Sequence, residues 1–324
     1  MRETVKANSE SFIRCFENAQ QHCRWGGNTY AATMACILIG EDKALTAEDF
    51  RNAQMIIKEN AGVFSLMRSG YAKEIVCAAV AASSDQQYAA EEIKRIHQML
   101  KAGLPDSSKL MVAATLIYLC SDPLRYETVV TKATEIYRGM KNNHPLLLWG
   151  ANVSNYVLLA MANKGTDVIS RDFEDCYIAN TARYRNKTAC LYAAGAMCLF
   201  DGPADARAES VVAWHQALKS IRFDFTSEGL ELIALLSGIF GSVDASLINE
   251  MNELSMMLST VKGLGNWGVG NKVRNMLSAA IVIDSLIEDE NYSAFAKQVI
   301  LNVLIRRLED DDSAAASAAG CAVI

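Results

Sequence analysis

Few residues in this chain have the types and spacing that chemistry needs. The 9 cysteines and 4 histidines include no CxxC, HxxxH or HExxH spacing, which are arrangements that hold metal ions or redox disulfides. Most cysteines lie inside apolar stretches, where a free cysteine behaves as a small hydrophobic residue. We therefore expect no metal site and no cofactor.

Two glutamates offer a different kind of chemistry. Glu228 and Glu231 are three residues apart, so both would lie on one face of a helix, and paired carboxylates act as acid and base in glycosidases. A solvated or helix-capping role explains the same spacing, and we favour it. The glycine-rich segment 263–270 follows an amphipathic helix rather than a strand. We therefore interpret it as a turn and not as a phosphate-binding loop.

A short basic segment is a candidate for binding an anion. Arg183, Arg185 and Lys187 alternate with Tyr184 and Asn186 near a predicted helix start, where backbone N–H groups attract negative charge. The alternative interpretation is a solvated loop. The formal net charge of −6 argues against nucleic acid as a partner, because phosphate backbones bind basic surfaces.

Polar and aromatic residues recur near the predicted starts of apolar helices. In an array of stacked helical hairpins these starts share one rim, so the residues could converge on a groove or cavity. The two tryptophans in this set could instead be packing residues. The ligand-binding candidates are Arg68, Tyr71, His144, Trp149, Asn155, Arg183, Arg185, Asn186, Trp267 and Asn271.

The elements that must position these residues follow a period of about forty residues. Apolar residues at helical spacing in 89–100 recur 40 residues later in 129–140, which predicts amphipathic helices. Between them lie runs such as 110–120 and 230–240 that are apolar almost throughout, as in helices buried on more than one side. These runs are shorter than the roughly 18 residues needed to span a bilayer, so we expect no membrane partner.

Together the two helix types predict an all-α fold of about seven stacked hairpins of ~40 residues. The array forms an α/α superhelix, or solenoid, that either stays open or closes into an α/α toroid. The apolar helices favour closure, because an open array would need a more polar concave face. We expect an N-terminal helix or cap at 1–23, a single helical-hairpin repeat domain at 24–310 and a disordered tail at 311–324. The predicted hairpins lie near 24–63, 64–103, 104–143, 144–182, 183–222, 223–262 and 263–310.

The two ends of the sequence bear on localisation. Residues 1–10 are polar and lack the apolar core of a signal peptide, so we expect a cytoplasmic protein. The last four residues, Cys321-Ala-Val-Ile324, match the prenylation pattern. The acidic run 309–312 before them opposes attachment to an anionic membrane. We favour an unmodified tail.

Two segments resemble a known family. The segment 64–69 has the pattern FSxxRS, and 136–145 has the pattern IYxxMKxxHP. Both are similar to a family of uncharacterised bacterial proteins, domain of unknown function four thousand and three, over about residues 20–300. The family tends to carry acidic residues before Tyr156, where this chain has Trp149, Asn152 and Asn155. The resemblance implies a bacterial origin and assigns no reaction.

Two functional hypotheses from different classes remain. We favour a non-enzymatic module that binds or scaffolds an unidentified peptide, protein or small ligand along its rim or concave face. The alternative is an enzyme or small-molecule binder with its site in the central cavity of a closed toroid. Convergence of Arg68, His144 or Glu228 on such a cavity would favour the alternative. The sequence leaves the oligomeric state open.

Overall fold

The protein is built entirely from helices in the part of the chain that the structure describes. The computed structural model describes residues 1–22, 27–38, 45–62, 65–68, 70–143, 153–287 and 290–321, and only the backbone of the helical residues 22, 143, 290–292 and 310–321. Within these ranges there are 15 α-helices and three short 3₁₀ turns, and no strand. The all-α prediction is confirmed.

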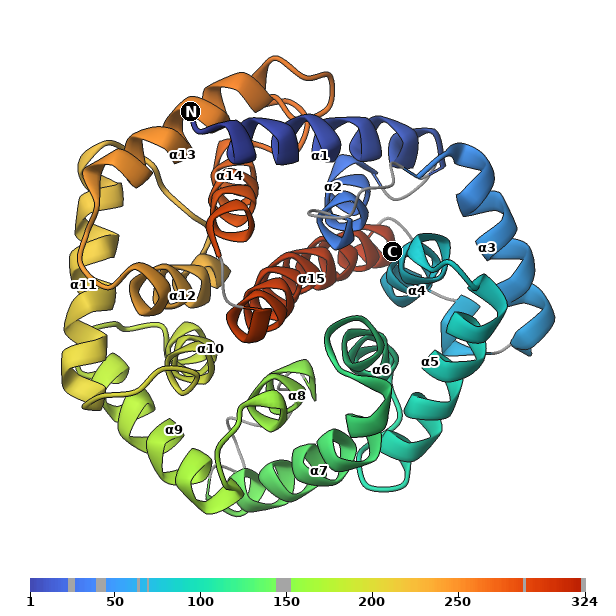
Figure 1. Ribbon diagram of the computed structural model, residues 1–324, viewed down its shortest axis with the longest axis horizontal. Helices are drawn as coiled ribbons and strands as arrows, with labels where there is room; N and C mark the ends of the chain where they lie inside the picture. Colours follow the sequence, from blue (N-terminus) through green and yellow to red (C-terminus); the bar gives the residue numbers. More distant parts are fainter. Residues whose placement is uncertain are drawn as a thin grey trace.

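Fourteen of these helices form two concentric layers of a ring, and the fifteenth lies in its centre (Figure 1). The outer layer consists of α1 (Glu3–His22), α3 (Ala47–Asn60), α5 (Gln86–Lys101), α7 (Tyr126–Asn143), α9 (Thr166–Thr181), α11 (Ala204–Ser220) and α13 (Ala245–Ser259). The inner layer consists of α2 (Gly27–Ile37), α4 (Gly70–Ala82), α6 (Ser108–Cys120), α8 (Val153–Met161), α10 (Lys187–Met197), α12 (Leu230–Phe240) and α14 (Asn271–Leu286). The central helix is α15 (Glu290–Cys321), and the 3₁₀ turns are η1 (Leu66–Arg68), η2 (Pro123–Arg125) and η3 (Ser227–Gly229).

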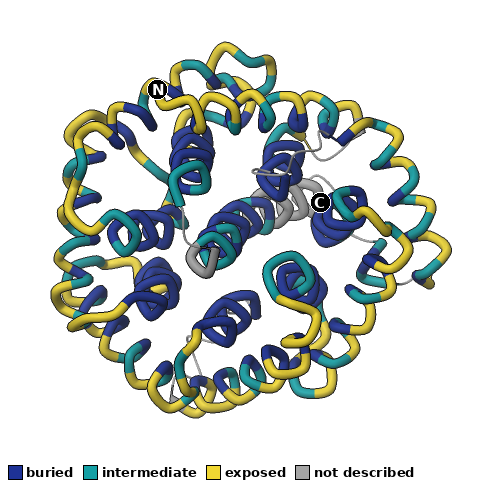
Figure 2. Tube along the Cα trace, viewed as in Figure 1, coloured by how far each residue is buried: buried dark blue, intermediate teal, exposed yellow. Residues whose placement is uncertain are grey.

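The outer helices are amphipathic because one side faces solvent. In α5, Ala89, Ile93, Ile96 and Leu100 are fully buried, which is the apolar stripe expected of a helix that covers a core. Asp85 begins this helix, and its carboxylate accepts a hydrogen bond from the backbone N–H of Tyr88. Figure 2 shows exposed residues along the outer side of this layer.

The inner helices are apolar on all sides because they are covered on all sides. Every residue from Leu110 to Ile117 in α6 is buried, and α6 packs against α5, α4, α8 and α15. Figure 2 shows the inner layer and the described part of α15 as almost entirely buried. The predicted burial of these apolar runs agrees with the structure.

The seventh predicted hairpin is not built as the sequence suggests. The range 263–310 contains α14 and most of α15, but α15 lies in the centre of the ring instead of outside α14. Helix α1 packs against α14 and occupies the outer position there. The physical reason is the burial pattern, since α15 is buried almost all round between Ala296 and Arg306, whereas α1 buries only one face.

Polar contacts connect the N-terminal residues to α13 and α14. The guanidinium of Arg2 pairs with Glu250 of α13 at 3.1 Å, and the amide of Asn8 donates to the hydroxyl of Ser285 in α14 at 2.9 Å. Residues 1–23, predicted as an N-terminal helix or cap, contain α1, which packs against α2 at the start of the helical array and against α14 at its end.

At the other end, α15 continues to Cys321, where the composition predicts a disordered tail from residue 311. The backbone is helical there because alanine, the main residue of this segment, has the highest helix propensity. Residues 322–324, which complete the prenylation pattern, lie outside the described residues. No helix among those described is both long enough and apolar enough to cross a membrane.

Candidate functional site

A cleft lies where inner helices α10 and α12 begin. Each inner helix follows an outer helix in the chain. We call the side of the ring at which the inner helices begin the rim face. Two adjoining pockets open here, and they share Asn186, Ala189 and Ser227 as lining residues. We call the larger one the outer chamber and the smaller one the inner chamber. Asn186, a candidate from the sequence, precedes α10 and lines both pockets.

The outer chamber has a volume of about 330 Å³ and aromatic walls. The rings of Tyr184 and His215 stack with centroids 5.6 Å apart, and Phe223 meets Phe225 edge to face at 5.7 Å. Burial raises the pKa of Tyr184 to about 12, so its hydroxyl keeps its proton at neutral pH. These walls provide an apolar surface with a few polar groups, as ligand pockets usually do.

The loop that carries the two phenylalanines has an unusual backbone conformation. Arg222 has a φ of 59°, the only positive value for a non-glycine residue among the described residues. This left-handed conformation costs roughly 1–2 kcal/mol for a residue with a side chain. It turns the chain out of α11 immediately before Phe223, which is 2% exposed. Local strain of this kind often accompanies functional sites.

Cations at the mouth of the outer chamber lack ion-pair partners in the described part of the chain. Arg185 and Lys219 both line the chamber and are exposed. Arg183, two residues earlier, instead pairs with Asp205 at 3.1 Å and with Glu209 at 3.5 Å. Arg183 therefore ties α9 to α11, whereas Arg185 is available to a ligand.

Asn186 fixes the start of α10 between the chambers. Its side-chain oxygen accepts a hydrogen bond from the backbone N–H of Ala189 at 3.1 Å, the usual arrangement of a helix N-cap. The first turn of α10 contributes Thr188 and Ala189 to the lining of the cleft. The N-terminal turn of a helix carries unpaired N–H groups and a partial positive charge.

The inner chamber has a volume of about 180 Å³ and reaches the central helix. Arg306 of α15 lines it, pairs closely with Glu231 of α12 and stacks over the ring of Tyr192 of α10 at 3.8 Å. Glu231 is fully buried, and burial raises the pKa of its carboxyl while Arg306 opposes that shift. Glu231 is therefore committed to an ion pair, and only Glu228 of the two glutamates lines the chamber.

The sequence candidates that the structure describes lie in several different places. Arg185 and Asn186 line the cleft, and Tyr71 contacts its wall because its hydroxyl donates to Glu309 at 2.7 Å. Arg68 lies in a separate pocket beside Lys58 and Lys73, so it does not approach Glu228. His144 and Trp149 lie outside the described residues.

Asn155 is 3% exposed on α8 and lies against Gly195 of α10. A Cβ at Gly195 would overlap the amide of Asn155, so this close approach of two inner helices requires glycine.

Trp267 lines another pocket, formed mainly by the segment that joins α13 to α14, and Asn271 is the first residue of α14. Gly263, Gly265 and Gly268 in this segment have the GxGxxG spacing of a dinucleotide-binding loop, but they connect two helices, whereas that motif follows a strand. The glycines serve packing, since a Cβ at Gly268 would overlap the carbonyl of Gly263. The predicted turn agrees with the structure, and Trp267 is fully exposed on it.

Sequence reasoning did not select Lys219, Phe223, Phe225 or Arg306 as site residues. The Phe-Asp-Phe triplet at 223–225 is a local signal that could have been used, because two aromatic residues flank a polar one in a predicted loop. Arg306 is found only in space, since its partners come from α10 and α12.

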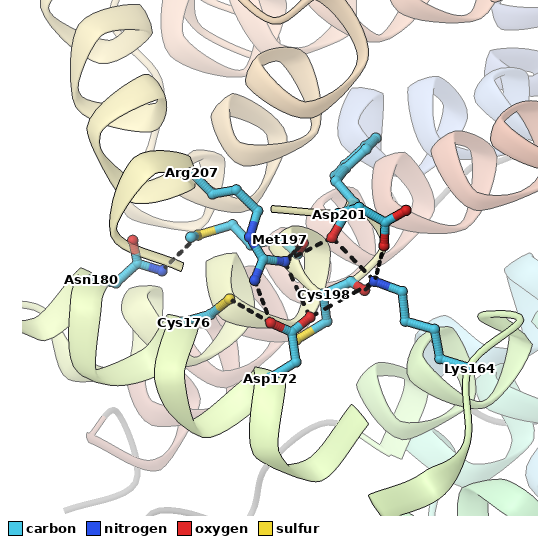
Figure 3. A network of polar contacts seen from close by, with 9 residues as sticks. Lys164, Asp172, Cys176, Asn180, Met197, Cys198, Asp201 and Arg207 are labelled. Carbon is cyan, nitrogen blue, oxygen red and sulfur yellow. Dashed lines mark hydrogen bonds and ion pairs between the residues drawn. The ribbon is translucent and has the colours of Figure 1, made fainter. Parts of the chain in front are cut away.

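A different polar cluster lies where α10 ends (Figure 3). Ligand atoms of Asp172, Cys176 and Cys198 lie within 4.8 Å of one another, but Arg207 binds both carboxylate oxygens of Asp172. Arg207 and Lys164 also donate to the carbonyls of Met197, Cys198 and Phe200. These cations therefore cap the C-terminal end of α10.

The thiols in this cluster are shielded from solvent. Burial raises the pKa of Cys198 well above that of an ordinary thiol, so a thiolate, the form that binds metals, is disfavoured at neutral pH. We interpret the cluster as a structural helix cap and not as a metal centre.

Comparison with known proteins gives one match. The profile of a family described as a protein of unknown function (DUF4003) matches residues 15–308. No curated protein and no solved structure matches the chain.

Proposed function

Because the chain belongs to the DUF4003 family, whose description assigns no activity, we propose its function from the cleft alone: the protein is a non-enzymatic module that binds a small anionic molecule with an aromatic or apolar body. The observation that carries this proposal is the outer chamber, in which aromatic walls meet two cations without ion-pair partners among the described residues.

The chemistry of the chamber supports this ligand class. A flat apolar group fits between Phe223, Phe225 and the stacked pair of Tyr184 and His215. A carboxylate or phosphate on that group would meet Arg185, which can bind two oxygens at once, and the N-terminal turn of α10. The volume of about 330 Å³ is at the lower end of the range of small-molecule pockets.

The enzyme hypothesis receives less support from the arrangement of the same residues. It requires a central cavity, but α15 occupies the centre of the ring. Arg68 and Glu228 line different pockets and so do not form one catalytic group. In the described cleft the hydroxyl of Ser227 donates to the carboxylate of Glu228 at 2.8 Å, and the hydroxyl of Tyr184 lies 3.3 Å from Nδ1 of His215. These contacts do not form a Ser-His-Asp triad.

Native mass spectrometry of the untagged protein is the first test. We expect a small molecule to co-purify, and its mass would identify the chemical class. An unliganded mass would leave the second test to decide.

The second test uses defined probes. We expect phenylacetate to bind the outer chamber and its neutral amide, phenylacetamide, to bind more weakly, measured by ligand-observed nuclear magnetic resonance. Replacing Arg185 and Lys219 together by glutamine should weaken phenylacetate binding by about tenfold or more, equivalent to ~1.4 kcal/mol. Lys187→Gln is the matched control, because Lys187 is exposed in the same segment and does not line either chamber. An empty protein that binds neither probe would contradict the proposal and favour a protein or peptide partner.

A further inference from the structure

We infer that the inner chamber binds a neutral polyhydroxylated group, such as a single sugar ring or a cyclitol. This inference rests on the proposed function and deepens it, because the two chambers adjoin and one ligand could occupy both. It depends on a different observation, which is a set of buried polar side chains along one face of the central helix.

A polar stripe runs along α15 into the core of the ring. Gln298, Asn302 and Arg306 are spaced four residues apart and so lie on one face of the helix. Gln298 and Asn302 are fully buried and Arg306 is 5% exposed. The residues between them, such as Val299 and Leu301, are buried and apolar. From Gln298 to Arg306, the three residues of the stripe are therefore the only polar ones.

Much of the hydrogen-bonding capacity of this stripe is unused among the described residues. Both side-chain polar atoms of Asn302, Oε1 of Gln298, and Nε and Nη1 of Arg306 have no protein partner there. The amide nitrogen of Gln298 donates to the backbone carbonyl of Ser154 on α8 at 3.3 Å, which places α8 against the stripe. On that helix, the side-chain oxygen of Asn155 and the hydroxyl of Tyr156 also lack partners within the described chain.

Leaving these groups without partners would be costly. Each buried donor or acceptor without a hydrogen bond costs about 1–3 kcal/mol of stability, and native proteins contain few of them. Several such atoms along one helix face, with Arg306 lining an accessible chamber, point to a bound polar molecule and its accompanying water.

The charges of the inner chamber select a neutral molecule. Arg306 is balanced by Glu231, and Lys109 pairs with Glu309 at 3.4 Å. An anion would meet the carboxylates of Glu228 and Glu309, and a cation would meet Lys109 and Arg306. A hydroxyl group both donates and accepts, so a polyol can bond to the donors of Arg306 and to acceptors that line the chamber without introducing charge.

The size of the chamber limits the ligand to one ring. Its volume of about 180 Å³ is below the roughly 300 Å³ at which pockets for drug-sized molecules begin. Asn186 and Ser227 line both chambers, so an apolar or charged substituent on the ring could extend into the outer chamber.

The test uses uncharged probes on the full-length protein. We would measure saturation transfer from the protein to D-glucose, D-galactose, D-mannose and myo-inositol, each supplied separately. We expect at least one of them to bind. Thr188→Val should weaken its binding by about tenfold or more, because it removes a hydroxyl that lines the chamber. Asn302→Leu should weaken it as well, because it removes unpartnered hydrogen-bonding atoms one helical turn from Arg306.

The variants are chosen so that a loss of binding cannot be attributed to unfolding. Thr188 is exposed in the first turn of α10 and lines the chamber, so valine removes only its hydroxyl. The matched control is Thr128→Val, an exposed first-turn position in α7 that lies away from both chambers. Asn302→Leu replaces an amide without a partner in the described chain by an apolar side chain of similar size, so the unliganded variant should remain folded.

Two results would overturn the inference. One is the absence of saturation transfer to all four probes. The other is binding that survives both Thr188→Val and Asn302→Leu, because the probe would then lie elsewhere. Phenylacetate binding separates the two proposals: if it persists while all four polyols fail, the inner-chamber inference fails alone, whereas loss of both kinds of binding removes the proposed function as well.

Discussion

Arg306 connects three helices through one side chain. It lies on α15, forms a close ion pair with Glu231 of α12 and stacks on Tyr192 of α10. Taking two charges out of water is expensive, and the loss is offset only when the pair keeps good geometry. We therefore expect the pair to fix the position of the central helix along its axis more than it adds to the overall stability.

Breaking this pair should be strongly destabilising. We expect Glu231→Gln and Arg306→Met each to lower the free energy of unfolding by about 3–5 kcal/mol, since each leaves a buried charge without its partner. The double variant Glu231→Leu with Arg306→Met should recover much of that loss, because no buried charge is left. Chemical denaturation of all three proteins measures this, and purely additive losses would show that the two residues do not act as a pair.

The lowered pKa of His215, which lines the outer chamber, predicts that stability depends on pH. Burial lowers the pKa of His215, with Lys219 acting in the same direction and Asp224 opposing it. Between the lowered folded value and the ordinary value of about 6.5, the unfolded chain binds more protons than the folded protein. Stability therefore rises with pH through this window and falls as the solution is acidified.

We expect His215→Gln to reduce the loss of stability between about pH 7.5 and about pH 6. His97 has a lowered pKa for the same main reason, burial, although Asp106 opposes it. The double variant His97→Gln with His215→Gln should therefore have the flatter profile in denaturant titrations. A His215→Gln profile as steep as that of the unmodified protein would contradict this assignment.

At the scale of elements, the two helix layers differ in how closely their neighbours approach. Gly238 of α12 lies against Phe200, and a Cβ there would overlap the aromatic ring. Gly139 of the outer helix α7 is exposed and has no atom within 4 Å of such a Cβ. Both glycines lie within helices, so alanine should gain helix propensity at each position. The two substitutions differ in the packing around the new Cβ.

Alanine should have opposite effects at these two positions. Gly139→Ala should raise the free energy of unfolding by up to about 1 kcal/mol, because alanine favours the helix. Gly238→Ala should lower the free energy of unfolding despite the same gain in propensity, because α12 or Phe200 must move. Thermal and denaturant unfolding of the two variants measure the contrast. Stabilisation by both substitutions would mean that α12 and Phe200 are not tightly packed.

Much of the element pattern could be predicted from the sequence, because periodicity reports how many sides of a helix are buried. The ranges from 24–63 to 223–262 each contain one inner and one outer helix. Arg185 and Asn186 were also selected, since they immediately precede an apolar helix. Arg306 could not be selected from the sequence, because helical periodicity indicates that α15 is buried but does not indicate which helices cover it.

At the scale of the whole molecule, the positions of α1 and α15 determine the architecture. Helix α1 contacts both α2 and α14, which are far apart in the sequence, and α15 contacts several inner helices. The first and last described helices therefore pack into the core of the ring.

Truncating a buried aromatic residue of α1 tests this arrangement. Phe12 is 1% exposed and stacks on Phe16 with ring centroids 6.2 Å apart. We expect Phe12→Ala to lower the free energy of unfolding by about 3–5 kcal/mol and to speed amide hydrogen exchange in both α2 and α14. Leu124→Ala is the control, because Leu124 is 93% exposed. Faster exchange in α2 alone would contradict the contact between α1 and α14.

The sequence alone determined that this protein is all-helical, because helix periodicity and apolar runs are local properties of the chain. It also selected Arg185 and Asn186, which immediately precede the inner helix α10. Only the tertiary structure decided that α1 lies outside α14, that α15 fills the centre and that Phe223, Lys219 and Arg306 join Arg185 around one cleft. The reason is physical: burial of a helix face is encoded along the helix, whereas its partner depends on which distant surface completes the core.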